Sequence, residues 1–461
     1  MMNLGPVFKA YDVRGVYPDQ LDAPTLTRIG AAFAEVCQAP KVVVGRDMRA
    51  SSEELAPAFM EGVVNRGVDV IDVGLVSTDA LYFASGLFGV PGAMLTASHN
   101  PPKYNGIKMC RAGASPIGQD TGLADIRRLA EQGLPKSERP GSISQEDIME
   151  RFVEHALKMV DTSTLRPLKI VVDAANGMAG KMVPPVFDRL PVELVPLYFE
   201  LDGSFPNHPA DPIQIENLAD LIKAIKLNNA DLGMAFDGDA DRVFLVDEHG
   251  QPASGSLITA LVAAQVLEAE PNSSIVYGLT CSRVVPETIR EMGGTPIRSR
   301  VGHSFIKQVM AESGAAFGGE HSGHYYFREN FRADSGLICS LFVLSALSKA
   351  KSAMSEVLQP YRRYWNSGEI NLTVEDQQGA FDRLASEFGD GQQDWTDGLT
   401  VDFPDWWFNA RASNTEPLVR LNVEAESPDL GKSRTERLKE IIKDTAPGPA
   451  AEEPGVAKSV G

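Results

Sequence analysis

The sequence contains little cysteine and no long apolar run. Its four cysteines, Cys37, Cys110, Cys281 and Cys339, lie far apart and form no CxxC pair, which is unlike a disulfide-rich secreted domain. No segment approaches the ~18–20 consecutive apolar residues that cross a bilayer, and residues 1–6 lack the basic and apolar regions of a secretory signal. We therefore expect a reduced, cytoplasmic protein.

Positive charge is also scarce. The chain has 43 Lys and Arg residues against 62 Asp and Glu, a formal net charge of -19, which disfavours binding to nucleic acid or to an anionic membrane. An anionic substrate would therefore require a local basic pocket. Of the seven histidines, four fall inside the polar motifs described below: His99, His303, His321 and His324.

Short apolar segments alternate with amphipathic segments, which is the pattern of an α/β protein. With 461 residues the chain exceeds the size of one hydrophobic core. Gly133 to Asp147 has the composition of a linker, and Ser144 with Asp147 is suited to cap a following helix. In the first part of the chain the pattern predicts strands at 41–45, 68–73 and 93–96 and a helix over about 52–66.

We predict three similar mixed-sheet α/β domains and a smaller C-terminal α+β domain around a central cleft. Strands expected at 169–173, 232–236 and 274–277 belong to the second and third domains. Several predicted strands end on a polar turn, and ligands of open α/β sheets bind at such carboxyl ends. The predicted domains span 1–140, 148–250, 251–360 and 366–446, followed by a tail, 447–461, that we expect to be disordered.

The most specific motif is the loop Phe236 to Arg242, which carries Asp237, Asp239 and Asp241. Three carboxylates at alternate positions can surround one hard cation. An EF-hand calcium loop is the alternative, and Glu248 stands at its twelfth position. However, Arg242 occupies the sixth position, where that loop needs glycine, and the flanks are strand-like. Magnesium, with phosphate oxygens completing its shell, fits better.

A second polar turn, residues 96–101, follows the third predicted strand and contains Ser98. Such a serine is often only a turn residue, and no G-x-S-x-G elbow of a hydrolase occurs. His99 would have to turn back sharply to act as its base. Facing a bound cation, Ser98 could instead carry a phosphoryl group. Lys108 follows nearby, and burial beside a metal would lower its pKa and allow it to move protons.

The other cations and polar residues form smaller groups. Arg14 and Tyr11 share a segment near the N-terminus, while residues 46–49 are interpreted as a salt-bridged turn with a structural role. In the loop 319–324, Glu320 and Ser322 can bind sugar hydroxyls. His303 either titrates near neutral pH or is structural. A guanidinium with neutral donors can hold a phosphate monoester, and the segment 411–420 supplies Arg411, Ser413, Asn414, Thr415 and Arg420.

These motifs, in this order from Tyr11 to Arg420, resemble those of the α-D-phosphohexomutase superfamily, and the G-E-x-S-G-H form at 319–324 resembles its phosphomannomutase/phosphoglucomutase branch. The resemblance implies that Ser98 is phosphorylated and that Arg242 lies beside the metal. It implies Mg²⁺ ligands at Ser98, Asp237, Asp239 and Asp241. It also implies active-site positions at Tyr11, Arg14, Lys108, His303 and His324, with Lys108 and His303 as candidates for proton transfer. Relatives differ at Thr280-Cys281-Ser282, where some carry lysine, and at Gly255-Ser256.

The expected function is that of a phosphomannomutase or of a dual phosphomannomutase/phosphoglucomutase. It would interconvert hexose 1- and 6-phosphates through phosphoserine and a bound hexose 1,6-bisphosphate. The alternatives are a phosphoglucosamine mutase, a metal-dependent sugar-phosphate phosphatase and a non-catalytic binding protein. Small hexose phosphates are the expected partners, and the chain could be a monomer or a dimer.

Overall fold

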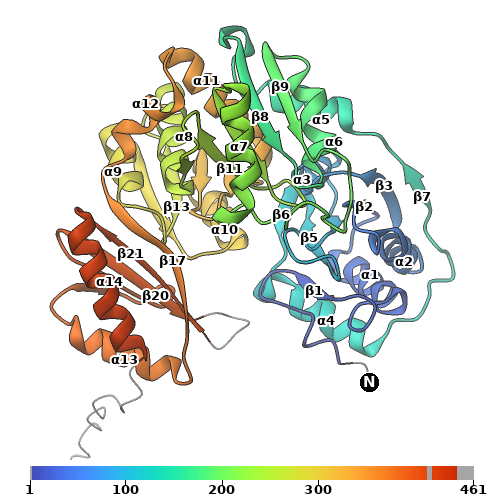
Figure 1. The fold of residues 1–461 in the computed structure, drawn as a ribbon. Coiled ribbons are helices and arrows are strands. Elements are labelled where there is room, and N and C mark those ends of the chain that lie inside the picture. Colours follow the sequence, from blue (N-terminus) through green and yellow to red (C-terminus); the bar gives the residue numbers. More distant parts are fainter. Residues whose placement is uncertain (1–2, 413–417, 444–461) are drawn as a thin grey trace, which may run out of the picture. The chain divides into compact units, whose positions relative to one another are not determined.

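The computed structural model describes residues 3–412 and 418–443, drawn in Figure 1. The predictions made for Ser413, Asn414, Thr415 and the tail 447–461 therefore lie outside the described residues. The chain divides into two compact units, Met1–Tyr361 and Arg362–Gly461, which are described separately.

The first sheet of unit 1 carries the turn with Ser98. Its strand order is β1-β5-β4-β2-β3-β7, and β6 pairs with β5. The strands β4, β2, β3 and β7 run parallel, whereas β1 and β5 are antiparallel to their neighbours. The elements are β1 (Val13–Val16), α1 (Ala23–Cys37), β2 (Lys41–Arg46), α2 (Ser52–Val64), β3 (Asp69–Leu75), α3 (Thr78–Phe88), β4 (Gly92–Leu95), β5 (Tyr104–Arg111), β6 (Ser115–Pro116), α4 (Leu123–Gln132) and β7 (Ile143–Gln145).

Strand β7 corrects the interpretation of residues 133–147 as a plain linker. Residues 143–145 pair in parallel with β3, and Ser144 donates its hydroxyl to Val70 O at 3.3 Å. Ser144 therefore does not cap the next helix, α5 (Met149–Leu157). Asp147 does accept a hydrogen bond from the Met149 amide at 2.9 Å. The composition missed this strand because β7 is short and exposed, so it has no apolar alternation.

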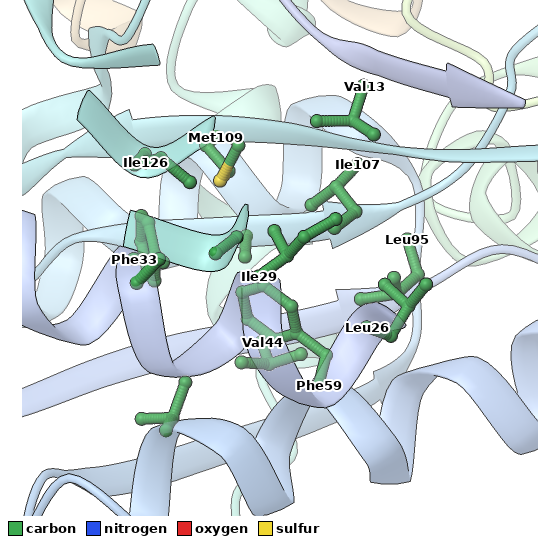
Figure 2. Packing of buried hydrophobic residues seen from close by; sticks show 14 of the residues in the cluster. Val13, Leu26, Ile29, Phe33, Val44, Phe59, Leu95, Ile107, Met109 and Ile126 are labelled. Carbon is green, nitrogen blue, oxygen red and sulfur yellow. The ribbon is translucent and has the colours of Figure 1, made fainter. Parts of the chain in front are cut away.

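The core of this first domain lies between its sheet and helices α1, α2 and α4. Figure 2 shows Ile29 and Phe33 of α1 packed with Phe59 of α2 and with sheet residues such as Val44. The two helices approach closely at glycine, since a Cβ on Gly30 would lie 2.1 Å from the Phe59 carbonyl oxygen. This packing fixes the sheet whose strand ends carry Ser98.

The second sheet positions the acidic loop. Its order is β12-β11-β10-β8-β9, with β8, β9 and β10 parallel and β11 antiparallel to β10. Residues 237–242 connect β10 to β11, so strands flank this loop as expected, and the EF-hand alternative is wrong. The elements are β8 (Leu168–Asp173), α6 (Ala179–Phe187), β9 (Val192–Leu197), α7 (Ala219–Asn228), β10 (Leu232–Phe236), β11 (Val243–Asp247) and β12 (Pro252–Ala253).

The third sheet carries the loop 320–324 between two antiparallel strands. Its order is β14-β13-β15-β16, and only the β15–β16 pair is antiparallel. The elements are α8 (Gly255–Ala269), β13 (Ser274–Gly278), α9 (Val284–Glu291), β14 (Thr295–Ser299), α10 (His303–Ser313), β15 (Phe317–Gly319), β16 (Tyr325–Phe327), α11 (Gly336–Ala350) and α12 (Met354–Leu358). Within the described ranges no single helix has the length and apolarity to cross a membrane; one pair, bent by 98°, passes on length and composition alone.

The described part of unit 2 forms a five-stranded antiparallel sheet, in the order β17-β21-β20-β19-β18, with two α-helices. It has a hydrophobic core of its own, which includes Trp406, Phe408 and Leu438. Three mixed sheets and a smaller C-terminal domain with an antiparallel sheet confirm the predicted fold class. The elements are β17 (Trp365–Thr373), α13 (Gln377–Glu387), β18 (Gln392–Asp394), β19 (Leu399–Asp402), β20 (Trp406–Ala412), β21 (Leu418–Ala425) and α14 (Pro428–Lys443).

Candidate active site

Three loops from the three sheets of unit 1 meet at one place. The Ser98 hydroxyl, after β4, donates to Asp237 Oδ2 at 2.6 Å, across 139 residues of sequence. His324, in the loop between β15 and β16, has its Nδ1 atom 3.8 Å from Asp241 Oδ1. The predicted convergence of strand ends is therefore present for the serine turn, the acidic loop and the loop 320–324.

The acidic loop concentrates negative charge in the interior. Asp237, Asp239 and Asp241 are almost fully buried, and one oxygen of each lies within 4.8 Å of the others. Lys108 Nζ lies 2.7 Å from Asp239 Oδ2 and also contacts Asp241. Arg242 Nη2 lies 2.9 Å from Asp237 Oδ2.

Two buried oxygens of this loop, the Oδ1 atoms of Asp239 and Asp241, have no hydrogen-bond partner among the described residues. An unpartnered buried carboxylate oxygen is costly, whereas a hard divalent cation prefers such ligands. The residues therefore fit a Mg²⁺ ion. Burial, with the neighbouring carboxylates, raises the pKa of Asp237 to about 7. Burial acts in the same direction on Asp239, but the adjacent Lys108 outweighs it and holds the pKa of Asp239 below its usual value.

The contacts of Lys108 with carboxylates act against the predicted fall in its pKa, which was made for a lysine beside a bound metal. Burial alone would lower that pKa, but Asp239 and Asp241 outweigh burial and raise it well above its usual value. We expected a metal and other cations beside Lys108, whereas its direct contacts are the carboxylates of Asp239 and Asp241. Lys108 is therefore an ammonium group that donates hydrogen bonds.

The serine turn is tighter than its sequence suggested. Ser98 adopts a left-handed conformation, with φ of 50°, and this sharp turn brings His99 Nδ1 to 3.2 Å from the Ser98 hydroxyl. Arg242 Nη2 lies 2.6 Å from the same Nδ1 atom. Burial, together with Arg242, lowers the pKa of His99 well below its usual value, so the ring is neutral. Arg14 also contacts this turn through the side chain of Asn100.

Glu320 joins two parts of the third sheet. Its side chain is buried, with Oε1 accepting from the Gly302 amide at 3.0 Å and Oε2 accepting from the Tyr326 hydroxyl at 2.6 Å. A carboxylate oxygen has two lone pairs, so both oxygens can still accept from a sugar hydroxyl. Ser322 is half-buried in the same loop.

His303 is the first residue of α10 and is not the neutral-pH group that the sequence suggested. Its Nε2 atom is buried and has no hydrogen-bond partner in the part of the chain that the structure describes. Burial together with Lys307 lowers its pKa well below the usual value. The ring of Tyr11 packs edge-on against it, with centroids 5.2 Å apart. The imidazole is therefore neutral and able to accept a proton.

Asp334 and Lys307 belong to the same region but were missed in the sequence. Asp334 accepts at 2.7 Å from His324 Nδ1 and lies 2.8 Å from Lys307 Nζ. Burial opposes the charged form of His324, but Asp241 and Asp334 outweigh it and raise its pKa. Asp334 precedes the N-cap serine of α11, so its sequence context suggests only a helix start.

Unit 2 presents a separate basic site. Arg411 of β20 and Arg420 of β21 stand directly opposite each other in the sheet. Glu369 of β17 lies between them, with Oε2 2.7 Å from Arg411 Nη2 and Oε1 3.1 Å from Arg420 Nη1. The sequence identified both arginines but not Glu369, because their pairing depends on strand register. Two adjacent guanidinium groups can bind a phosphate.

Comparison with known proteins agrees with this geometry. Four sequence models of phosphoglucomutase/phosphomannomutase match the chain in order: alpha/beta/alpha domain I at residues 5–135, domain II at 150–250, domain III at 254–364 and the C-terminal domain at 369–441. Together they cover nearly all of the described residues.

Individual relatives match over almost their whole length. A phosphomannomutase of Salmonella typhimurium is 40% identical, covering 94% of this chain and 98% of the relative. A phosphomannomutase of Methanocaldococcus jannaschii is 37% identical, covering 95% and 97%. A crystal structure of a Burkholderia thailandensis phosphoglucomutase/phosphomannomutase family protein superimposes with a TM-score of 0.87 at 35% identity, covering 96% of this chain and 98% of that one. The chain therefore belongs to the phosphoglucomutase/phosphomannomutase family.

Proposed function

We propose that this protein is a cytoplasmic phosphomannomutase that interconverts mannose 1-phosphate and mannose 6-phosphate and also accepts glucose phosphates. The observation that carries the proposal is the 2.6 Å contact between the Ser98 hydroxyl and Asp237. It joins a candidate phosphoryl carrier to a buried acidic loop with unpartnered oxygens. The similarity to several phosphomannomutases supports the choice of sugar.

In the proposed cycle, phosphorylated Ser98 donates its phosphoryl group to the free hydroxyl of a hexose phosphate. The bond between phosphorus and the serine oxygen breaks, a bond to the sugar oxygen forms, and the proton lost by the sugar is balanced by one gained at Ser98. Mg²⁺ bound by Ser98, Asp237, Asp239 and Asp241 would neutralise charge on the transferred group. The bound hexose 1,6-bisphosphate then turns end over end in the site and returns its other phosphoryl group to Ser98.

The protein's own groups supply the proton transfers and the charge. His303, neutral and with an unpartnered Nε2, is suited to take the proton of the attacking sugar hydroxyl. On the return step, the Ser98 hydroxyl has Asp237 Oδ2 and His99 Nδ1 within reach as acceptors. Lys108, held as an ammonium by two carboxylates, stabilises negative charge and does not act as the base. Arg242 and Arg14 add positive charge around Ser98.

Substrate recognition is assigned to two separate sets of residues. In unit 1, Glu320, Ser322, His324 and Tyr11 contact the sugar, with Glu320 as acceptor of its hydroxyl groups. In unit 2, Arg411 and Arg420, together with Ser413, Asn414 and Thr415, bind the phosphate that is not reacting. A guanidinium pair suits this role because it recognises any phosphate monoester without reading the sugar.

The decisive experiment measures isomerisation of mannose, glucose and glucosamine 1-phosphates side by side, with trace hexose 1,6-bisphosphate and Mg²⁺. We expect the highest rate with mannose phosphate, a lower rate with glucose phosphate and no accumulation of free phosphate. A preference for glucosamine phosphate would make the protein a phosphoglucosamine mutase. Steady release of phosphate would make it a phosphatase.

A further inference from the structure

One buried arginine holds the main chain of the serine turn. Arg49, between β2 and α2, is 1% exposed. Its Nη2 atom donates to the carbonyl oxygens of Ser98 at 2.8 Å and Asn100 at 2.6 Å. Its Nη1 atom donates to those of Pro101 at 3.0 Å and Tyr104 at 2.9 Å. A single guanidinium therefore spans the turn from Ser98 to the start of β5.

The serine turn needs such a partner because it contains no regular structure. Between β4 and β5 the chain turns through the left-handed Ser98 outside any helix or strand. Two backbone hydrogen bonds lie within the turn, from the Asn100 amide to Ala97 O and from the Tyr104 amide to Pro101 O, both at 3.0 Å. Buried carbonyl oxygens without donors are costly. The acidic loop closes the other side, since a Cβ on Gly238 would lie 2.4 Å from the Ser98 carbonyl oxygen. The Ser98 backbone is thus held between Arg49 and Gly238.

The charge of Arg49 is compensated and covered. Asp47 Oδ2 lies 3.3 Å from Arg49 Nε, and both side chains are 0% exposed. The ring of Phe205, from the loop after β9, lies 5.1 Å from Arg49 Cζ, and Gly203 approaches so closely that a Cβ there would lie 2.6 Å from Arg49 Cα. Burying an ion pair costs several kcal/mol of desolvation. Here the buried guanidinium donates four hydrogen bonds to the loop that carries Ser98.

We propose that Arg49 is a positioning residue for phosphoryl transfer, acting through the serine turn. This inference rests on the proposed function of Ser98 as the phosphoryl carrier. Arg49 touches no reacting atom; it fixes the Ser98 oxygen against the acidic loop so that the phosphoryl group points at the sugar. A misplacement of about 1 Å can cost about 100-fold in rate. A loosened turn also exposes phosphoserine to water.

The test compares Arg49→Lys, Arg49→Met and the control Arg151→Lys in the full-length protein. Lysine keeps a charge beside Asp47 but cannot donate to four carbonyl groups. Arg151 is also stacked on an aromatic ring, 5.2 Å from Phe88, and it pairs with Glu146 outside the proposed site. We measure kcat and KM for mannose 1-phosphate, free phosphate released per turnover, the phosphoryl adduct on Ser98 by intact mass, and Mn²⁺ affinity as a check on the acidic loop.

For Arg49→Lys we expect kcat to fall about 100-fold, with KM changed less than about threefold, Mn²⁺ affinity retained and more phosphate released per turnover. A merely structural role would lower the melting temperature without changing how the phosphoryl group partitions between transfer to the sugar and transfer to water. If both Arg49 variants show the kcat and partition of Arg151→Lys, the inference is wrong. If the wild type never carries a phosphoryl group on Ser98, the proposed function itself fails.

Phe205→Leu keeps the inference testable if the Arg49 variants do not fold. It removes the aromatic cover of the guanidinium and none of its hydrogen bonds. We expect a smaller change in the same direction, with kcat about threefold to tenfold lower and more phosphate released per turnover. An unchanged partition in Phe205→Leu, with Arg49 variants that fail to fold, would overturn the positioning role and leave Arg49 as a folding residue.

Discussion

The acidic loop of unit 1 and the arginine pair of unit 2 are two charged sites of opposite sign. In the first, three carboxylates face the cations Lys108 and Arg242. In the second, two guanidinium groups share the carboxylate of Glu369. Counting only these groups at their formal charges, the first set has one surplus negative charge and the second one surplus positive charge. By charge, the first site is suited to a cation and the second to an anion.

The two sites also differ in burial, which sets how strongly each depends on its charges. The side chain of Lys108 is 6% exposed and that of Asp239 is 0% exposed, whereas Arg411, Arg420 and Glu369 are 15%, 34% and 24% exposed. Charges interact more strongly away from water, and exposed ion pairs contribute little. Substitutions in unit 1 should therefore have larger effects than those in unit 2.

The largest effect is expected for Ser98→Ala, which removes the proposed phosphoryl carrier from the unit 1 site. Loss of a nucleophile lowers kcat by about 10⁴-fold or more, and the phosphoryl adduct should disappear from the intact mass spectrum. Ser386→Ala, at an exposed position of α13, serves as control and should match the wild type. A Ser98→Ala protein that retains more than about one-tenth of the wild-type rate would refute the carrier role.

The next largest effect is expected for Asp239→Asn, which removes one negative charge from the acidic loop. Without that charge the carboxylates of the loop no longer outnumber the cations Lys108 and Arg242, so a divalent cation binds less well. Mg²⁺-dependent kcat should therefore fall about 100- to 1,000-fold. Mn²⁺ binding, followed by electron paramagnetic resonance, should weaken in parallel. Asp125→Asn removes the same charge from an exposed position and should bind Mn²⁺ normally. Equal Mn²⁺ affinity in both variants would contradict a metal site at Asp239.

Burial in unit 1 also predicts a dependence of stability on pH through Asp79, at the start of α3. Its carboxylate accepts from the Ser335 hydroxyl at 2.6 Å, and burial raises its pKa to about 7, against about 3.9 in an unfolded chain. Between these values the folded state binds more protons than the unfolded state. The stabilisation is therefore complete below pH ~4 and is lost as the pH rises towards ~7.

Asp79→Asn should flatten this pH dependence, by about 3 kcal/mol across the window. The measurement is the free energy of unfolding in urea between pH 4 and 7, without added metal. Asp237, whose pKa is also raised to about 7, leaves a residual slope of the same sign. A variant with the wild-type slope would show that Asp79 does not take up a proton on folding.

The contrast between the two sites also separates what the sequence could predict from what it could not. The fold class, Ser98 and the acidic loop follow from local patterns at strand ends and from the family resemblance, since each motif is contiguous in the chain. Whether the His99 ring comes within hydrogen-bond distance of the Ser98 hydroxyl depends on one left-handed φ angle, that of Ser98. The sign of the Lys108 pKa shift depends on which loop it faces. Such features are set by tertiary contacts, which no local pattern contains.

Glu369 illustrates the same limit in unit 2. Its sequence neighbours indicate only a strand, and its role follows from the register of three strands: Asn371 of β17 pairs with Arg420, which pairs with Arg411. Like charges directly opposite each other in a sheet are unfavourable, so the arginine pair requires a nearby carboxylate. This requirement is apparent only when the strands are aligned.

The smallest effect is expected for Glu369→Gln, which removes the compensating charge from the arginine pair. Unit 2 should lose about 1 kcal/mol of stability, measured by differential scanning calorimetry, because two opposed guanidinium groups then repel each other. Added sulfate should restore the loss by binding the pair, and it should stabilise the variant more than the wild type. Glu387→Gln, which removes a partner of Arg437 on the surface of the same unit, is the matched control. If sulfate stabilises both variants equally, the arginine pair is not an anion site, and the opposition in sign between the two regions is lost.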